Sequence, residues 1–162
     1  YYGGIDVRSG ADVTFQPGTY ILAGGGFSVS SNGKVTGAGV MFYNTLNPTQ
    51  PNGAGAFGAI SVSSTRPVVL SAPTAGTYGG ILFFQDRLNT IQASFTAGAN
   101  GKLDGVIYAA AANVHLQAGA DLLYTQIVAG SLSLQGGPVL NLPTTPLLFG
   151  GNGAALVAWQ DY

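Results

Sequence analysis

Short segments in which apolar and polar residues alternate follow one another along this chain, with glycine-rich turns between them. Residues 3–15 read GGIDVRSGADVTF, and residues 25–37 read GGFSVSSNGKVTG. Alternation with a period of two is typical of strands that bury one face. The apolar positions recur at an offset of 22 residues, as Ile5 and Phe27, Val7 and Val29, and Val13 and Val35. The chain therefore contains a degenerate internal repeat built from strands.

Each repeat holds three alternating segments, and six repeats are recognisable. Successive first segments begin 22, 33, 31, 23 and 18 residues apart, and turn-rich insertions at residues 45–57, 73–78 and 85–89 account for the longer spacings. The first segments are expected to point inward at Ile5/Val7, Phe27/Val29, Ile60/Val62, Ile91/Ala93, Val114/Leu116 and Leu132/Leu134. The second segments are expected to do so at Val13/Phe15, Val35, Val68/Leu70, Leu103, Leu122 and Leu140/Leu142. The third segments are expected to do so at Tyr20/Leu22, Val40/Phe42, Ile81/Phe83, Val106/Tyr108, Ile127/Ala129 and Leu147/Phe149.

Three strands per repeat, each stacked on its equivalent in the next repeat, predict an all-β fold. The expected architecture is a right-handed parallel β-helix with three faces and about six to seven coils, filling residues 1–162 as one domain. Val29, Val62, Leu116 and Leu134 would then share one buried stack in the lumen. A β-sandwich also uses short strands and glycine turns, but it does not readily produce a 22-residue recurrence.

The third segments differ from the others because their outward positions are apolar too. These outward residues are Ile21, Met41, Tyr43, Leu82, Phe84, Ile107, Val128 and Leu148. A long exposed apolar stripe is uncommon on a soluble monomer and marks an interaction surface. We therefore expect the third face to be covered by residues 45–57, by residues 154–162 with Trp159, or by a protein partner or a second copy of the chain.

Charged residues make up only 7% of the chain and hydrophobic residues 46%, and the formal net charge is −1. This balance argues against disorder, and no basic patch is present for nucleic acid or anionic lipid. The chain has no cysteine, and no apolar run approaches the roughly 20 residues that span a bilayer. We therefore expect no disulfide, no thiolate metal site and no membrane insertion by this segment. Because Tyr1 already lies in a strand-like pattern, we expect a fragment or mature portion of a longer exported protein.

The residues that could carry chemistry are few and scattered. His115, the only histidine, stands in the string VHLQ, where it should point outward as an ordinary polar surface residue. Glycoside hydrolysis needs paired carboxylates, but no two aspartates are expected on adjacent rungs of one face. The aspartates are Asp6, Asp12, Asp86, Asp104, Asp121 and Asp161. We therefore predict no catalytic, cofactor or metal site.

Two further motifs have structural interpretations. Asp86 and Arg87 follow an apolar strand-like run, and we expect the aspartate to accept backbone N–H bonds while the arginine braces a neighbouring turn. The triple glycine at residues 24–26 lacks the spacing and the following helix of a phosphate-binding loop. It is expected to form a corner between two strands.

Three strings carry a resemblance to a known family: FQPGTYILAGGGFSVSSNGKVTGAGVMFYN from Phe15, YGGILFFQDR from Tyr78, and LDGVIYAAAANVHLQAG from Leu103. Together they resemble the C-terminal β-helical region of TadG-like proteins of the tight-adherence (Flp) pilus system. The resemblance covers about residues 1–142. It implies an extracellular or cell-envelope location on the bacterial surface and a structural role, and it brings no catalytic residues with it.

The leading hypothesis is therefore a non-catalytic structural or adhesive module of a surface or pilus-associated assembly, and not an enzyme. A carbohydrate-binding or carbohydrate-cleaving β-helix is the alternative, which aromatic residues beside an aspartate on one exposed face would favour. Ice binding is a further alternative, because hydroxyl groups recur on the outside of the first face. Its outward positions are Asp6/Arg8, Ser28/Ser30, Ser61/Ser63, Gln92/Ser94, His115/Gln117 and Ser133/Gln135. Charge, histidine and glutamine interrupt this ladder and threonine is missing from it, so we expect no ice binding.

Overall fold

The computed structural model describes residues 1–97, 101–117, 121–123, 126–136 and 139–141. Its regular structure consists of β-strands and one short 3-10 turn, η1 (Gly53–Gly55). Each strand pairing is parallel. In this part of the chain no helix has the length and apolar character that crossing a membrane requires. The predicted all-β class with parallel strands is confirmed.

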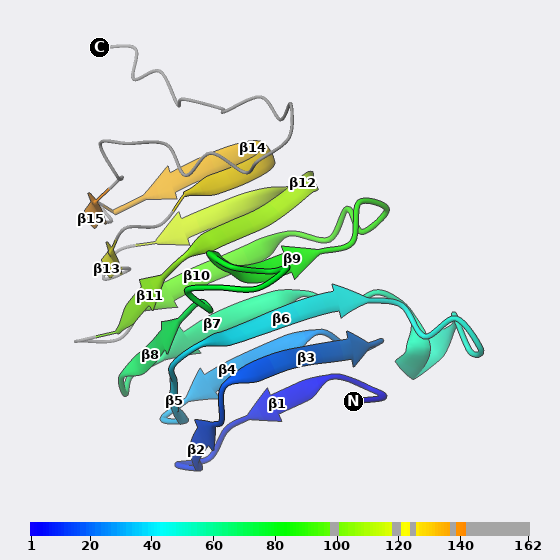
Figure 1. Ribbon diagram of the computed structural model, residues 1–162, viewed down its shortest axis with the longest axis horizontal. Helices are drawn as coiled ribbons and strands as arrows, with labels where there is room; N and C mark the ends of the chain where they lie inside the picture. The colour runs from blue at the N-terminus through cyan, green and yellow to red at the C-terminus, as the bar shows by residue number, and fades with distance from the viewer. Residues whose placement is uncertain (98–100, 118–120, 124–125, 137–138, 142–162) are drawn as a thin grey trace.

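The strands form three stacks of parallel strands, called files here, that begin at the N-terminal end of the molecule (Figure 1). The first file contains β1 (Ile5–Val7), β4 (Phe27–Ser31), β7 (Ile60–Ser64), β10 (Ala93–Ala97) and the C-terminal parts of β12 (Val106–Gln117) and β14 (Ile127–Gln135). The second contains β2 (Asp12–Phe15), β5 (Lys34–Gly37), β8 (Val68–Ser71), β11 (Lys102–Asp104), β13 (Asp121–Leu123) and β15 (Val139–Asn141). The third contains β3 (Gly18–Ala23), β6 (Val40–Thr45), β9 (Ile81–Gln85) and the N-terminal parts of β12 and β14. Because β12 and β14 run through both the first and third files, these files make one nine-stranded sheet, and the second file is a separate six-stranded sheet.

The 22-residue recurrence in the sequence corresponds to the strand register of the first two rungs, in which residues 22 positions apart pair with each other. Its pairs are Ile5 with Phe27, Val7 with Val29, and Val13 with Val35. The next rung continues the ladder with Ile60 and Val62. Equivalent positions of successive repeats therefore lie side by side, which gives the molecule a nearly closed, solenoid-like shape.

The fourth strand of the first file begins two residues later than the sequence pattern predicts. In β10, Phe95 pairs with Val62, so Ala93 and Phe95 occupy the lumen positions that were expected for Ile91 and Ala93. Ile91 is instead 41% exposed. Ala93 lies inward as predicted, but the inward position predicted for Ile91 was wrong. A shift of two residues keeps the same side chains inward, so the alternation does not specify at which residue the strand begins.

Hydrogen bonds in the preceding turn decide where the strand begins. The Ile91 N–H donates to Asn89 Oδ1 at 3.0 Å, and the Ile91 carbonyl accepts from Gln85 Nε2 at 2.7 Å. These bonds keep Ile91 in the turn. The strand then places Ser94 and Thr96 on the outward side.

A row of phenylalanine rings, contributed by all three files, fills the lumen. Successive ring centroids lie 6.2 Å apart from Phe15 to Phe27, 4.7 Å from Phe27 to Phe42, 5.4 Å from Phe42 to Phe83, and 5.7 Å from Phe83 to Phe95. All five side chains are buried. Contacts at these separations stabilise the core beyond the burial of apolar area alone.

The predicted lumen stack is correct for three of its four members. Val29, Val62 and Leu116 are almost fully buried, but Leu134 is 54% exposed and Leu132 is 40% exposed. Both leucines lie on β14, whose described partner in the first file is β12 on one side. Among the described residues β14 has a first-file neighbour on one side only, so its inward side chains pack against a single neighbouring rung.

The triple glycine forms the corner between β3 and β4, as predicted. Gly24, Gly25 and Gly26 have φ values of 88°, 71° and 76°, which L-residues with side chains rarely adopt. A Cβ at Gly25 would overlap the carbonyl oxygen of Gly3, and one at Gly26 would overlap that of Ala59. The corners of adjacent coils therefore stack backbone against backbone.

Candidate functional site

The outward side of the third file carries a continuous row of apolar and aromatic side chains. The row consists of Ile21, Tyr43, Phe84, Tyr108 and Val128, which pair in register. Ile21 is 53% exposed, and the other four are partly exposed. An outward apolar row is thus present on this face, but its members differ in part from those expected.

Leu82 and Ile107 belong to the core and not to the outward row, which corrects the sequence-based assignment. Both are fully buried in the hydrophobic core. β9 holds one extra residue, Leu82, between the residues that pair with Val106 and Ile107, which is a β-bulge. A shift of one residue exchanges the two faces of a strand. Tyr108, expected in the lumen, therefore faces outward and Ile107 faces inward.

Met41 occupies an outward position in the alternation of β6, as predicted, but it is only 2% exposed. Met41, Leu82 and Ile107 are thus all buried within a single copy of the chain. Two other predicted features, Leu148 and the possible cover formed by residues 154–162, lie outside the described residues. This part of the third face needs no second subunit to be buried.

The insertion at residues 45–57 projects from the end of β6 (Figure 1) and forms one wall of a groove. The groove has a volume of about 480 Å³, and its apolar lining comes from Tyr2, Ile21, Leu46, Pro48, Phe57 and Leu88. Tyr2 and Leu88 are 79% and 76% exposed. The insertion therefore flanks the exposed end of the outward row without covering it.

Asp86 lies beside this groove, and its carboxylate is engaged in structural hydrogen bonds. Oδ2 accepts from Thr45 Oγ1 at 2.8 Å and from the Tyr43 hydroxyl at 3.4 Å, while Oδ1 accepts from the Leu88 N–H at 3.0 Å. The Leu88 bond is the backbone N–H contact that the sequence predicts for this residue. Asp86 thus ties the turn after β9 to the end of β6.

Aromatic rings of the outward row stack along the axis of the molecule. Phe84 and Tyr108 lie 4.6 Å apart at an interplanar angle of 6°, and Tyr43 meets Phe84 edge to face at 5.4 Å. The Arg87 guanidinium carbon lies 5.8 Å from the Tyr108 ring centroid, within cation–π range. Arg87 was expected to brace a turn, and the structure instead places it over this ring.

A cluster of buried side-chain amides lies where the insertions leave β6 and β9, and the sequence pattern did not predict it. Asn44 and Gln85 pair in register, and Asn44, Gln85 and Asn89 are fully buried. Asn44 and Asn89 both donate side-chain hydrogen bonds to the Gly58 carbonyl, at 2.9 and 3.0 Å. Asn44 and Gln85 each follow a lumen phenylalanine by two residues, so the alternation of the strand places their side chains on the inward side. This spacing is the sequence feature that could have predicted their burial.

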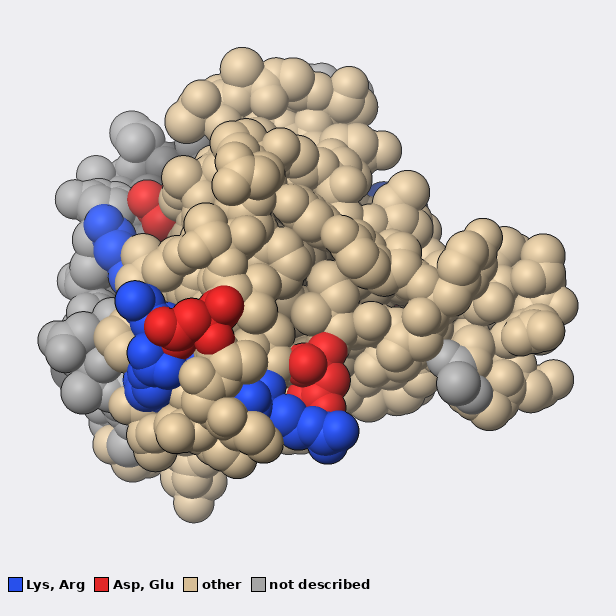
Figure 2. Space-filling model, turned by 90° about the horizontal axis from the view of Figure 1, so that it is seen from below, with Lys and Arg blue, Asp and Glu red and all other residues tan. Residues whose placement is uncertain are grey.

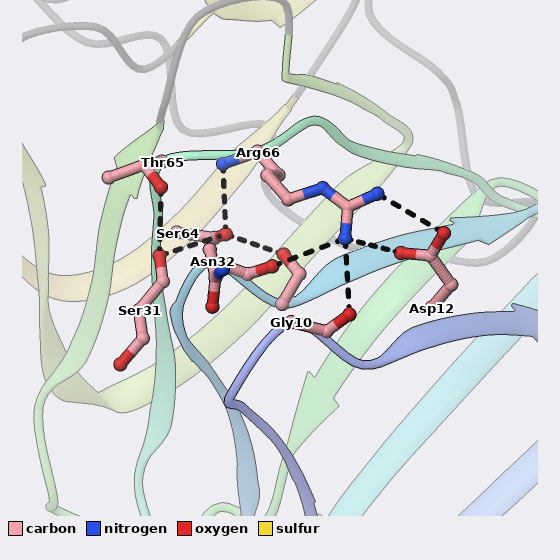
Figure 3. Close-up of polar contacts among 8 residues, drawn as sticks. Gly10, Asp12, Ser31, Asn32, Ser64, Thr65 and Arg66 are labelled. Atoms are coloured by element: carbon pink, nitrogen blue, oxygen red, sulfur yellow. Dashed lines mark hydrogen bonds and ion pairs between the residues drawn. The ribbon is translucent and has the colours of Figure 1, made fainter.

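On the face of the molecule that Figure 2 shows, acidic and basic side chains lie next to each other. Arg66 makes the most contacts and joins three successive coils (Figure 3). Its guanidinium binds both carboxylate oxygens of Asp12, at 2.6 and 3.1 Å, and donates to the carbonyls of Gly10 and Asn32 at 3.2 and 3.4 Å. This bidentate geometry suits an arginine that holds a corner.

The other candidate residues are dispersed. Asp6 pairs with Arg8 at 3.3 Å on the exposed end of the first file. His115 faces outward as predicted, with Nδ1 3.0 Å from Ser133 Oγ. Asp161 and the side chain of Asp121 lie outside the described residues. Over the ranges that the structure describes, no three metal-ligating side chains come together.

Comparison with known proteins gives no match. No family model, no curated protein and no solved structure matches this chain. The resemblance to TadG-like proteins therefore stays a prediction, and the geometry of the chain itself is the basis for its proposed function.

Proposed function

We propose that this chain is a right-handed parallel β-helix that serves as a non-catalytic structural or adhesive module of a bacterial surface or pilus-associated assembly. Each strand of the first rungs pairs with the strand three places further along the chain, as in β1–β4–β7 and β2–β5–β8. Parallel crossover connections are right-handed in nearly all proteins. The coil is therefore assigned the right hand.

The observation that carries the proposal is the continuous side-chain filling of the lumen. Buried apolar residues run without interruption from β1 to β12, and parallel hydrogen-bonded ladders surround them. At about 4.8 Å per rung, six rungs extend about 24 Å. Such a rod is stiff because neither its packed core nor its paired backbone leaves room for local rearrangement. This is what a spacer or a scaffold for surface contacts requires.

The surface that would meet a partner is the exposed end of the third face. Tyr2, Ile21 and Leu88 are each more than half exposed and line the same groove. Exposed apolar groups that gather at one place mark an interaction surface. The proposed contact, with another protein or with a second copy, is thus narrower than the full stripe expected from the sequence.

Paired lysine substitutions test this role. Ile21→Lys with Leu88→Lys should abolish self-association in sedimentation experiments, or adhesion by cells that display the full-length protein, and should leave the melting temperature unchanged. Val69→Lys is the matched control, because Val69 is an apolar residue of the second file that is 38% exposed. The proposal fails if the double variant associates and adheres like the wild type.

One observation favours the carbohydrate-binding alternative: Tyr43, Phe84 and Tyr108 lie near Asp86 on one side of the molecule. Sugars bind to open ring faces, but Phe84 and Tyr108 cover each other at 4.6 Å. Titration with oligosaccharides, followed by the chemical shifts of the tyrosine rings, distinguishes the two functions. Saturable shifts that Tyr108→Ala removes would replace the structural proposal with a sugar-binding one.

The corrected register also changes the hydroxyl ladder of the first face. Its fourth rung carries Ser94 and Thr96 in place of Gln92 and Ser94, so one threonine joins the serines. Histidine and glutamine still interrupt the fifth rung, and the ladder lacks a regular array of methyl and hydroxyl groups. We expect no thermal hysteresis from the purified chain, and a measurable value would establish ice binding.

A further inference from the structure

The insertion that forms one wall of the groove carries an asparagine followed by a glycine at its exposed tip. Asn52 and Gly53 are both exposed, Asn52 has φ −115° and ψ 162°, and Gly53 has φ 59°. Glycine has no side chain to obstruct its backbone nitrogen. The side-chain amide of the asparagine is therefore accessible to the nitrogen of the next residue once the peptide plane rotates.

We propose that Asn52 and Gly53 form a self-modifying site that converts Asn52 to a mixture of aspartate and isoaspartate without an enzyme. The Gly53 nitrogen loses its proton to solvent base and attacks Asn52 Cγ. A new N–C bond forms, the bond from Cγ to Nδ2 breaks, and the amide nitrogen leaves as ammonia with a proton from water. Water then opens the cyclic imide at Cγ to give aspartate, or at the backbone carbonyl to give isoaspartate.

The surroundings of Gly53 permit this reaction. In the part of the chain that the structure describes, no protein atom accepts a hydrogen bond from the Gly53 N–H. The Asn52 carbonyl accepts one bond, from the Gly55 N–H at 3.2 Å. Ring closure requires the Asn52 ψ angle to leave its extended value. Two bonds local to the turn oppose this rotation: the bond to the Asn52 carbonyl and the one that the Ala56 N–H donates to the Gly53 carbonyl at 3.1 Å.

A second Asn–Gly pair in the same molecule has the opposite surroundings. The Gly33 N–H donates to the Ser30 carbonyl at 3.0 Å, and the Asn32 carbonyl accepts from Arg66 at 3.4 Å. Gly33 is buried, and a Cβ there would meet the Val7 carbonyl at 2.8 Å. The peptide plane between Asn32 and Gly33 is therefore fixed on both sides, and the folded chain should protect Asn32.

Conversion of Asn52 changes the groove wall. Each event adds one negative charge, so the formal net charge goes from −1 to −2. An isoaspartate also adds one methylene to the main chain inside the turn that the Gly55 N–H closes. This turn belongs to the same insertion as Pro48 and Phe57, which line the groove.

Peptide mapping by mass spectrometry after incubation at mildly alkaline pH tests the proposal, with fragmentation that separates isoaspartate from aspartate. In the native protein the Asn52 peptide should gain both products while the Asn32 peptide stays unmodified. In denaturant both peptides should react, because both then expose the same Asn–Gly dipeptide without folded structure around it. Two further Asn–Gly pairs, Asn100 with Gly101 and Asn152 with Gly153, also contribute to a charge change of the whole protein, so each is mapped as its own peptide. Asn52→Gln should remove both products from the peptide that holds residue 52 and leave the other three peptides unchanged.

Two results would overturn the proposal. One is an Asn52 peptide that stays intact in the native protein while it reacts in denaturant. The other is equal conversion of Asn32 and Asn52 in the native protein. Neither outcome depends on whether the chain serves as a structural module, so this test and that of the proposed function fail independently.

Discussion

Placing a carboxylate at Val62 is the most direct probe of the lumen. Val62 is 2% exposed and lies between Val29 and Phe95 in the stacked rungs. Val62→Asp gives up about 1.5–3 kcal/mol of apolar burial. The buried carboxyl group, neutral but without a hydrogen-bond partner, costs about 1–3 kcal/mol more. The free energy of unfolding should therefore fall by about 2.5–6 kcal/mol, a large part of the total for a domain of this size.

Ser63→Asp is the matched control, because Ser63 is the next residue of β7 and is exposed. Both variants place aspartate in the same strand, so the low strand propensity of aspartate contributes equally to each. The melting temperature, followed by circular dichroism, should fall by roughly 10–20 °C for Val62→Asp and by only a few degrees for Ser63→Asp. Equal melting temperatures for the two variants would refute the assignment of Val62 to the lumen.

Four further predictions follow from the same structure. Leu134→Asp should lower the free energy of unfolding, measured in urea, by less than half as much as Val62→Asp, because Leu134 is 54% exposed. An equal loss of stability would mean that the inward side of β14 is covered. Gly26→Ala and Gly3→Ala both place a side chain on a residue with positive φ, which costs about 1–2 kcal/mol in each variant. Only the new Cβ of the Gly26 variant also overlaps a backbone carbonyl, so this variant should melt at a clearly lower temperature than Gly3→Ala. Arg66→Ala should lower stability by about 1 kcal/mol and Arg8→Ala by less than about 0.5 kcal/mol, since the Arg8 side chain is 70% exposed and that of Arg66 is 35% exposed and also donates to two backbone carbonyls. The reverse order in denaturant titrations would contradict the corner role of Arg66. EDTA should leave the melting temperature unchanged, and a fall of several degrees would reveal a metal site.

The sequence by itself determined the strand class, the parallel files and the phase of the first rungs. Ile5, Phe27 and Ile60 recur in register because an uninterrupted alternation has only one way to bury its apolar side. The corner at residues 24–26 was also predictable, since only glycine tolerates a positive φ together with such close backbone contact. These features depend on local sequence, and local sequence was sufficient for them.

The tertiary structure alone decided which residues of the later rungs face outward and which face inward. The bulge at Leu82 exchanged the places of Ile107 and Tyr108, and the turn bonds of Ile91 moved the start of β10. The amide of Asn44 became a core group because it reaches the Gly58 carbonyl, which the sequence separates from it by an insertion. Alternation fixes the phase of a strand only until the first irregular residue. After that point the phase depends on hydrogen bonds between distant residues, and a single sequence does not specify these contacts.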